Sequence, residues 1–192
     1  MRKRLNRPTL EEINQEIGRR QQQQRTHRTL RGVLYFLAVV AAIAVLVATL
    51  WMPVLQITGS SMEPTLNDDE LAIAIKTEHF KTGDVIAFYY NNKILIKRVI
   101  ATAGQYVDLQ EDGTVLVDGV ALDEPYLKEK SKGECNIQLP YQVGDGQIFV
   151  MGDNREFSID SRTTSVGTIS TEKVLGRVVF KIWPLSAIER VK

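Results

Sequence analysis

The sequence predicts a mainly β fold, an antiparallel β-sheet domain preceded by one N-terminal transmembrane helix. One run, residues 32–52, has 21 residues without a charge, Asn, Gln or Pro. After Pro53 the pattern changes to short β-type runs separated by turn residues, and no long amphipathic helix interrupts them. A chain of 192 residues is long enough for one anchoring segment and one globular domain with a core.

The first 31 residues form a basic leader. They carry nine Arg or Lys against three Glu, a net charge of +6, whereas the remaining residues carry fifteen basic and twenty acidic side chains. A nucleic-acid partner would require basic charge on the folded domain, so the leader indicates membrane orientation and no nucleic acid. Leu10, Ile13 and Ile17 have helical spacing and allow a short amphipathic helix, while the glutamines at 21–24 favour a partly disordered tail.

Residues 32–52 have the length and composition of a membrane anchor. At about 1.5 Å per residue they form a helix of roughly 31 Å, the thickness of a bilayer core. A buried core helix would show a polar stripe, and a cleavable signal has a shorter apolar run behind a short basic stretch. The positive-inside rule places residues 1–31 in the cytoplasm, and we expect residues 53–192 to form an extracytoplasmic domain.

Six β-type runs follow the anchor. The pair Asn91-Asn92 and the pair Asp118-Gly119 have the residue types of two-residue hairpin turns. Residues 128–146 are expected to form a long loop or an irregular insertion. The expected strands are Leu71 to Ile75, Asp84 to Tyr90, Lys93 to Ala101, Thr114 to Val117, Gln147 to Met151 and Val174 to Trp183.

Few residues are available for hydrolytic chemistry. Of the two histidines, His27 lies on the cytoplasmic side of the anchor, and His79 stands among charged residues typical of a solvated loop. A Ser-His-Asp triad is therefore poorly supported. Cys135 is the only cysteine, and no His or Cys cluster has metal-ligand spacing, so we expect no disulfide, no metal and no cofactor.

A serine activated by a lysine is the remaining route to a nucleophile. In the strand that contains Lys97, alternation places Leu95, Lys97 and Val99 on one face. If that face is buried, the lysine pKa falls and a neutral amine becomes a general base. The alternative from periodicity alone is a solvated lysine on an edge strand.

Four motifs in order resemble those of the type I signal peptidases, a family of Ser/Lys peptidases. The first, Gly59-Ser60-Ser61-Met62-Glu63-Pro64-Thr65, is similar to the family's serine box and follows the anchor directly. The resemblance covers roughly residues 30–185. The other three motifs are Gly83-Asp84-Val85-Ile86-Ala87-Phe88, Lys97-Arg98-Val99-Ile100 and Gly152-Asp153-Asn154-Arg155-Glu156-Phe157-Ser158-Ile159-Asp160-Ser161-Arg162.

The resemblance implies a role for each matched residue. Ser61 is expected to be the nucleophile, with its N–H at the oxyanion, and Lys97 the general base. Ser158 resembles a hydroxyl that hydrogen-bonds to the lysine and orients it. The remaining expected site residues are Gly59 and Gly152 near the oxyanion, the ion-pairing Asp153, Asp160, Arg98 and Arg162, and Met62 and Pro64 at the substrate.

The chain departs from the family pattern at two places. Some members have a serine where this chain has Gly59, so a backbone group is expected to serve the oxyanion instead. After Ile100 the family usually continues with a Gly-x-Pro-Gly-Asp turn, whereas residues 101–105 read Ala-Thr-Ala-Gly-Gln. Neither departure removes a reacting group, but the second predicts an altered loop or weaker activity.

The implied function is removal of N-terminal signal peptides from secreted preproteins by a membrane-bound serine endopeptidase. The family's substrates have small residues at the first and third positions before the cut. Lipid is the second expected partner, because Ser61 lies only nine residues beyond Met52. Two alternatives stay open: a self-cleaving Ser/Lys repressor of the LexA type, and a membrane-anchored β-rich binding factor without turnover.

Overall fold

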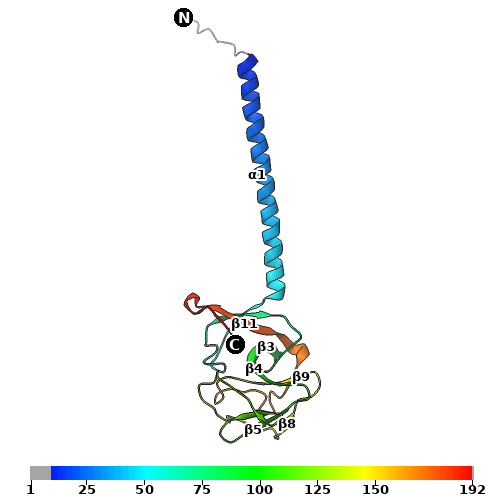
Figure 1. Cartoon of the computed structure of the whole chain (residues 1–192), viewed down its shortest axis with the longest axis vertical. Coiled ribbons are helices and arrows are strands. Elements are labelled where there is room, and N and C mark those ends of the chain that lie inside the picture. Colours follow the sequence, from blue (N-terminus) through cyan, green and yellow to red (C-terminus); the bar gives the residue numbers. More distant parts are fainter. Residues whose placement is uncertain (1–9, 192) are drawn as a thin grey trace. The chain divides into compact units, whose positions relative to one another are not determined.

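The computed structural model describes residues 10–191, which divide into two compact units at the Thr49–Leu50 boundary. Figure 1 shows one long helix and a β-rich body. The predicted fold class, antiparallel β-sheets with one long apolar N-terminal helix, is confirmed.

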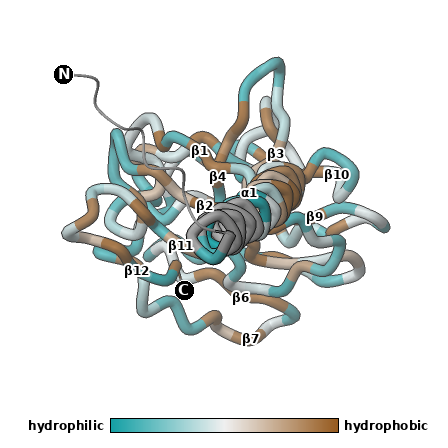
Figure 2. The backbone as a smooth tube through the Cα atoms, turned by 90° about the horizontal axis from the view of Figure 1, so that it is seen from above, coloured by the Kyte–Doolittle hydropathy of each residue, from teal (hydrophilic) through white to brown (hydrophobic). Residues whose placement is uncertain are grey.

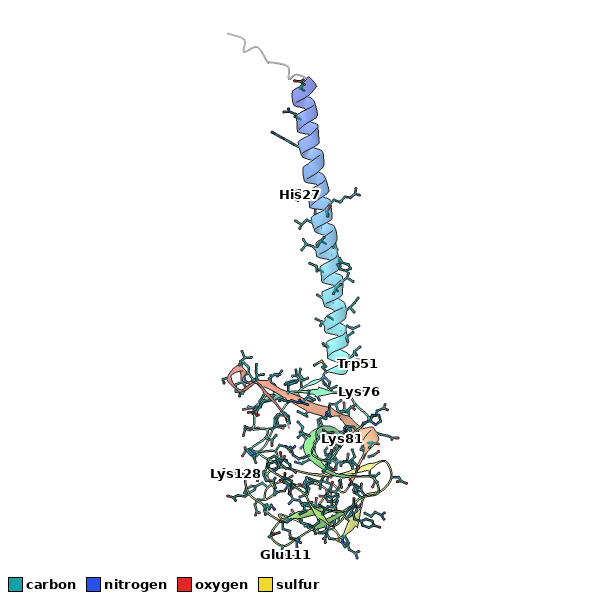
Figure 3. The ribbon with its side chains drawn as sticks, in the orientation of Figure 1. His27, Trp51, Lys76, Lys81, Glu111 and Lys128 are labelled. Carbon is teal, nitrogen blue, oxygen red and sulfur yellow. The ribbon has the colours of Figure 1, made fainter. Side chains whose placement is uncertain are left out.

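The helix α1 runs from Leu10 to Trp51 without a break. Its part from His27 to Trp51 is long and apolar enough to cross a membrane, and none of that stretch is buried against protein. Figure 3 labels these two residues, and Figure 2 shows the apolar colouring of the helix. The leader from residue 10 is helical, so the disordered alternative is wrong for that part; residues 1–9 lie outside the described residues.

The second unit contains two antiparallel sheets. In the larger sheet the order is β1-β2-β11-β3-β4-β9-β10, with β12 paired to β11; the smaller sheet has the order β7-β6-β5-β8. In Figure 1, β5 and β8 lie at the end of this unit farthest from β11. The strands are β1 (Val54–Gln56), β2 (Leu71–Ile75), β3 (Val85–Tyr90), β4 (Lys93–Thr102), β5 (Tyr106–Leu109), β6 (Val115–Val117), β7 (Val120–Ala121), β8 (Tyr141–Gln142), β9 (Gln147–Met151), β10 (Ile169–Ser170), β11 (Val174–Trp183) and β12 (Glu189–Arg190), and two short 3₁₀ helices span Thr171–Lys173 and Leu185–Ala187.

Both predicted hairpin turns are present. Asn91 and Asn92 have φ values of 45° and 62° and join β3 to β4, and Asp118 with Gly119 joins β6 to β7. These left-handed conformations are the ones that Asn, Asp and Gly tolerate best, so the turn residues set the register of the two hairpins.

The buried apolar residues of the second unit gather in three clusters. One lies under β1, β2 and the segment after β1, a second lies on β3, β4 and β9, and a third joins the two sheets. Cys135, Ile137 and Leu139 pack against the third cluster, so part of the 128–146 stretch covers the smaller sheet. The stretch is otherwise irregular apart from β8, as predicted.

Candidate active site

Ser61 and Lys97 come from different elements and meet in space. Ser61 follows β1 in a turn, and Lys97 lies in the middle of β4. The Nζ atom of Lys97 lies 2.6 Å from the Oγ atom of Ser61, although the residues are 36 apart in sequence. This is within the distance for direct proton transfer between a nucleophile and its base.

The environment of Lys97 favours a neutral amine. The residue is 3% exposed. Burial is the largest cause of a pKa lowered to about 8; the carboxylates of Asp160 and Asp153 oppose the shift, and Arg162 adds to it. A lysine with such a pKa is uncharged in about a tenth of the molecules at pH 7 and in about half at pH 8, far more than an ordinary lysine.

The strand around Lys97 is more enclosed than alternation predicts. From Lys97 to Ala101 every residue of β4 is buried, because core clusters cover the strand: Val99 packs in one cluster, and Ile100 and Ala101 pack in another. The strand is also not an edge strand, since β3 and β9 flank it in the large sheet. The solvated edge-strand alternative is therefore wrong for Lys97, while Lys93 and Ile94 at the beginning of the strand are exposed.

A groove of about 600 Å³ leads to the Ser61–Lys97 pair. One wall consists of residues 54–59 with Ser61 and Met62, and the other of residues 93–97, so both reacting side chains line the groove. The strand β1 lies at an edge of the large sheet, and β9 pairs with β4 only from Arg98 onward. Among the described residues, the groove is thus bordered by two strand segments whose backbone groups are not paired across it.

Gly59 lies in the turn before the nucleophile. Its φ of 88° is a left-handed conformation that favours glycine. Its N–H donates to Asp68 at 2.8 Å, so that group is already used. The N–H of Ser61 has no hydrogen-bond partner among residues 10–191 and remains available to an oxyanion.

Two fully buried ion pairs lie behind the Ser61 and Lys97 side chains. Arg98 donates to both carboxylate oxygens of Asp153 at 2.8 and 2.6 Å, and Arg162 donates to Asp160 at 2.9 Å. The Asp160 carboxylate also accepts the Gly152 N–H at 2.9 Å. Unlike surface ion pairs, these charges are removed from water and depend on each other.

Ser158 differs from the expectation. Its Oγ is buried and has no hydrogen-bond partner among the described residues, so the expected hydrogen bond to Lys97 is not formed. Ser158 lies beside Gly152, where a Cβ atom would collide with the Ser158 hydroxyl and with the Ser61 carbonyl. Glycine at this position thus allows the two loops to approach each other.

Met62 and Pro64 lie in different surroundings. Met62 is 2% exposed, belongs to the core and contributes to the groove lining. Pro64 does not line this groove; it borders two other pockets, on the side of Tyr126 and on the side of Phe157.

Sequence reasoning missed several residues that surround the site. Thr65 donates to Asp153, and Asn154 donates through its N–H and its Nδ2 to the carbonyls of Ser61 and Ser60, both at 3.1 Å. Arg155 and Glu124 form a buried ion pair. The first three stand inside the quoted motifs, but Glu124 has no sequence signal of its own.

A comparison with known protein families also points to a peptidase. A family model described as signal peptidase, peptidase S26, matches residues 30–183. The chain belongs to this family. Members of the signal peptidase family remove signal peptides from preproteins, and bacterial signal peptidase I is membrane-anchored.

This chain is similar to individual signal peptidases over most of their length. The chain is 38% identical over 150 residues to signal peptidase IB of Staphylococcus aureus, and the aligned part is 68% of this chain and 77% of that protein. It is 35% identical over 167 residues to signal peptidase I of Bacillus licheniformis, covering 80% and 88%. A crystal structure of a signal peptidase I from Enterococcus faecalis matches 52% of this chain and 96% of that chain, with 30% identity and a TM-score of 0.45.

Membership of the signal peptidase family favours the peptidase over both alternatives raised from the sequence. The apolar helix α1 occupies the place where a LexA-type repressor would carry its DNA-binding domain. The chain is a serine peptidase of the signal peptidase type, so a binding factor without turnover is the poorer description.

Proposed function

We propose that the chain cleaves preproteins by a Ser/Lys dyad, with Ser61 as nucleophile and Lys97 as general base. The observation that carries this proposal is the 2.6 Å distance between Lys97 Nζ and Ser61 Oγ. The low exposure of Lys97 supports it, because a buried amine with a lowered pKa accepts a proton near neutral pH.

The reaction proceeds by acyl transfer in two steps. Neutral Lys97 takes the Ser61 proton as Oγ attacks the peptide carbonyl, and the resulting ammonium then gives a proton to the leaving amine. A water molecule, deprotonated by the same amine, hydrolyses the acyl-enzyme. The Ser61 N–H donates to the oxyanion, and loss of such a donor typically costs about 10²–10³ in rate.

The groove supports a substrate bound as an extended strand. Main-chain groups of β1 and of Lys93–Ile96 border it, and such strand edges bind peptides by adding a strand. Leu55, Ile57 and Leu95 present aliphatic side chains there. We expect small residues at the first and third positions before the cut, since larger side chains would clash with these walls.

The proposed topology follows from α1 and the basic leader. Residues 1–31 are cytoplasmic, residues 32–52 span the membrane and residues 53–192 form the extracytoplasmic peptidase domain. The positive-inside rule supports this orientation, because Arg28 and Arg31 directly precede the apolar run. Ser61 then lies within roughly 32 Å of the extracytoplasmic face of the membrane, where a membrane-tethered signal peptide is cut.

Cleavage of a preprotein by the detergent-solubilised full chain tests the dyad. Ser61→Ala and Lys97→Ala should each abolish cleavage while the far-ultraviolet circular dichroism spectrum stays unchanged. Ser60→Ala, which alters the neighbouring exposed hydroxyl, is the matched control and should cleave at the wild-type rate. Substantial cleavage by folded Lys97→Ala would show that another group is the base.

A further inference from the structure

The segment from Leu122 to Asn136 contacts all three buried arginines of the active-site motifs. The Tyr126 ring lies against the Arg98 guanidinium, whose central carbon is 3.8 Å from the ring centre. The Glu124 carboxylate accepts hydrogen bonds from both terminal nitrogens of Arg155. The Lys132 carbonyl accepts a hydrogen bond from Arg162 at 2.8 Å. None of the residues in this segment belongs to the four motifs.

Glu124 completes the charge balance behind the site. Arg98, Arg155 and Arg162 are each 1% exposed, and the motifs supply only two fully buried carboxylates to balance them, Asp153 and Asp160. Glu124, with a side chain that is 1% exposed, is the third. Without it, a buried guanidinium would have no carboxylate partner, an unfavourable arrangement in a low-dielectric interior.

Arg155 connects Glu124 to the reacting groups through hydrogen bonds. The Nε atom of Arg155 donates to the Gly152 carbonyl at 3.1 Å. Asn154, the residue before Arg155, donates its N–H to the Ser61 carbonyl. Glu124 thereby holds the loop that fixes the backbone of the nucleophile.

Tyr126 connects the same segment to the base. It contacts Arg98, the residue after Lys97 in β4. The Tyr126 hydroxyl donates to Glu124 at 2.8 Å. Burial and the Glu124 carboxylate raise the pKa of Tyr126, so the hydroxyl keeps its proton and remains a donor over the working pH range.

We propose that Glu124 and Tyr126 are positioning residues of the signal peptide cleavage reaction. Glu124 fixes the Ser61 loop through Arg155, and Tyr126 fixes β4 at Arg98, so that together they hold the Ser61 hydroxyl and the Lys97 amine in reach of each other. This inference rests on the proposed Ser61/Lys97 dyad.

Kinetics of Glu124→Gln with a preprotein substrate test the inference. We expect kcat to fall about 10- to 100-fold with a much smaller change in KM, because the reacting atoms are displaced while the groove is kept. Asp160, Asp153 and Arg162 are the charged groups acting on Lys97. Arg155 donates to the carbonyl of Gly152, whose N–H donates to Asp160. Removing the Glu124 charge leaves the positive charge of Arg155 unbalanced there, so the midpoint of the pH–kcat profile should move to lower pH.

The matched control is Glu172→Gln, which makes the same change at an exposed residue outside the site and should retain wild-type kinetics. A lowered melting temperature with unchanged kcat and unchanged pH midpoint would mean that Glu124 only stabilises the fold, and would overturn the inference. The proposed dyad would still stand in that case if the wild type cleaves the preprotein and Lys97→Ala does not. The two proposals can therefore fail separately.

Two tyrosine variants keep the inference testable if Glu124→Gln does not fold. Tyr126→Phe removes only the hydroxyl that donates to Glu124, and Tyr126→Leu also removes the ring over Arg98. We expect kcat to decrease in the order wild type, Tyr126→Phe, Tyr126→Leu, with Tyr89→Phe at an exposed tyrosine as the control. Wild-type kcat in folded Tyr126→Leu would contradict the role of Tyr126.

Discussion

Arg98 and Asp153 form a buried ion pair in which the guanidinium donates through Nε and Nη2 to both carboxylate oxygens. Thr65, four residues after Ser61, donates to the same carboxylate. Since Arg98 follows Lys97 in β4, this one pair joins the strand of the base to the loop of the nucleophile. The distance between the reacting atoms therefore depends on charges that do not take part in the reaction.

Asp153→Asn should both destabilise the chain and slow cleavage. The substitution removes the carboxylate charge that pairs with the buried Arg98 guanidinium, and breaking such a pair costs about 3–5 kcal/mol in the free energy of unfolding. Urea denaturation of the wild type and the variant measures the loss. Glu111→Gln, which removes an exposed ion pair with Lys132, is the comparison and should leave the stability unchanged. Equal stability of Asp153→Asn and the wild type would show that the buried pair contributes nothing.

Gly152→Ala should reduce cleavage strongly. The added Cβ atom would collide with the Ser158 hydroxyl and the Ser61 carbonyl, so the two loops must separate. A displacement of the nucleophile of about 1 Å can cost about 100-fold in rate. Initial rates with a preprotein measure the effect. Gly144→Ala, where the new methyl group meets only the flexible end of the Gln147 side chain, should retain activity. A fully active Gly152→Ala would mean that the contact between the loops is not required.

Lys97→Met should abolish cleavage and stabilise the fold. Burial is the largest cause of the lowered pKa of Lys97, so the enclosed amine costs free energy in the folded state at neutral pH. A methionine of similar length removes this cost, and we expect a gain within the range of about 0.5–2 kcal/mol that single stabilising substitutions commonly give. Thermal unfolding at pH 7 measures the change. Lys93→Met, at an exposed position of the same strand, should have little effect, and a lower melting temperature for Lys97→Met would contradict the expected cost of burial.

The sequence predicted the regular strands well. β2, β9 and β11 have the predicted bounds, and β4 extends one residue further, because long runs of β-branched and aliphatic residues are bounded by turn residues. The short strands β1, β7, β8, β10 and β12 were missed, since two or three residues do not establish a period. β5 was also missed, with Asp108 interrupting an otherwise apolar run.

The motifs predicted the reacting residues and the two ion pairs behind them, Arg98–Asp153 and Arg162–Asp160. They did not predict the contacts of Thr65 and Asn154 or the Arg155–Glu124 pair. Lys97 by its strand pattern alone could have been solvated, because alternation does not reveal that core clusters cover both faces of β4. Glu124 and Arg155 are 31 residues apart, and no local pattern relates them. The expected hydrogen bond from Ser158 to Lys97 is not formed. A resemblance to a family predicts which residue stands at a position, but not the rotamer of its side chain.

The pH dependence of preprotein cleavage tests the central claim most directly. Only the neutral amine of Lys97 accepts the Ser61 proton, so kcat should be low well below the pKa, rise with pH and level off above a midpoint near the pKa of about 8. Cleavage by the full chain in detergent, followed from pH 6 to pH 10 within the range of stable folding, measures this midpoint. A rate that rises through a single group near pH 8 is the predicted result; a rate independent of pH across that interval, or one that falls as pH increases, would contradict a lysine base.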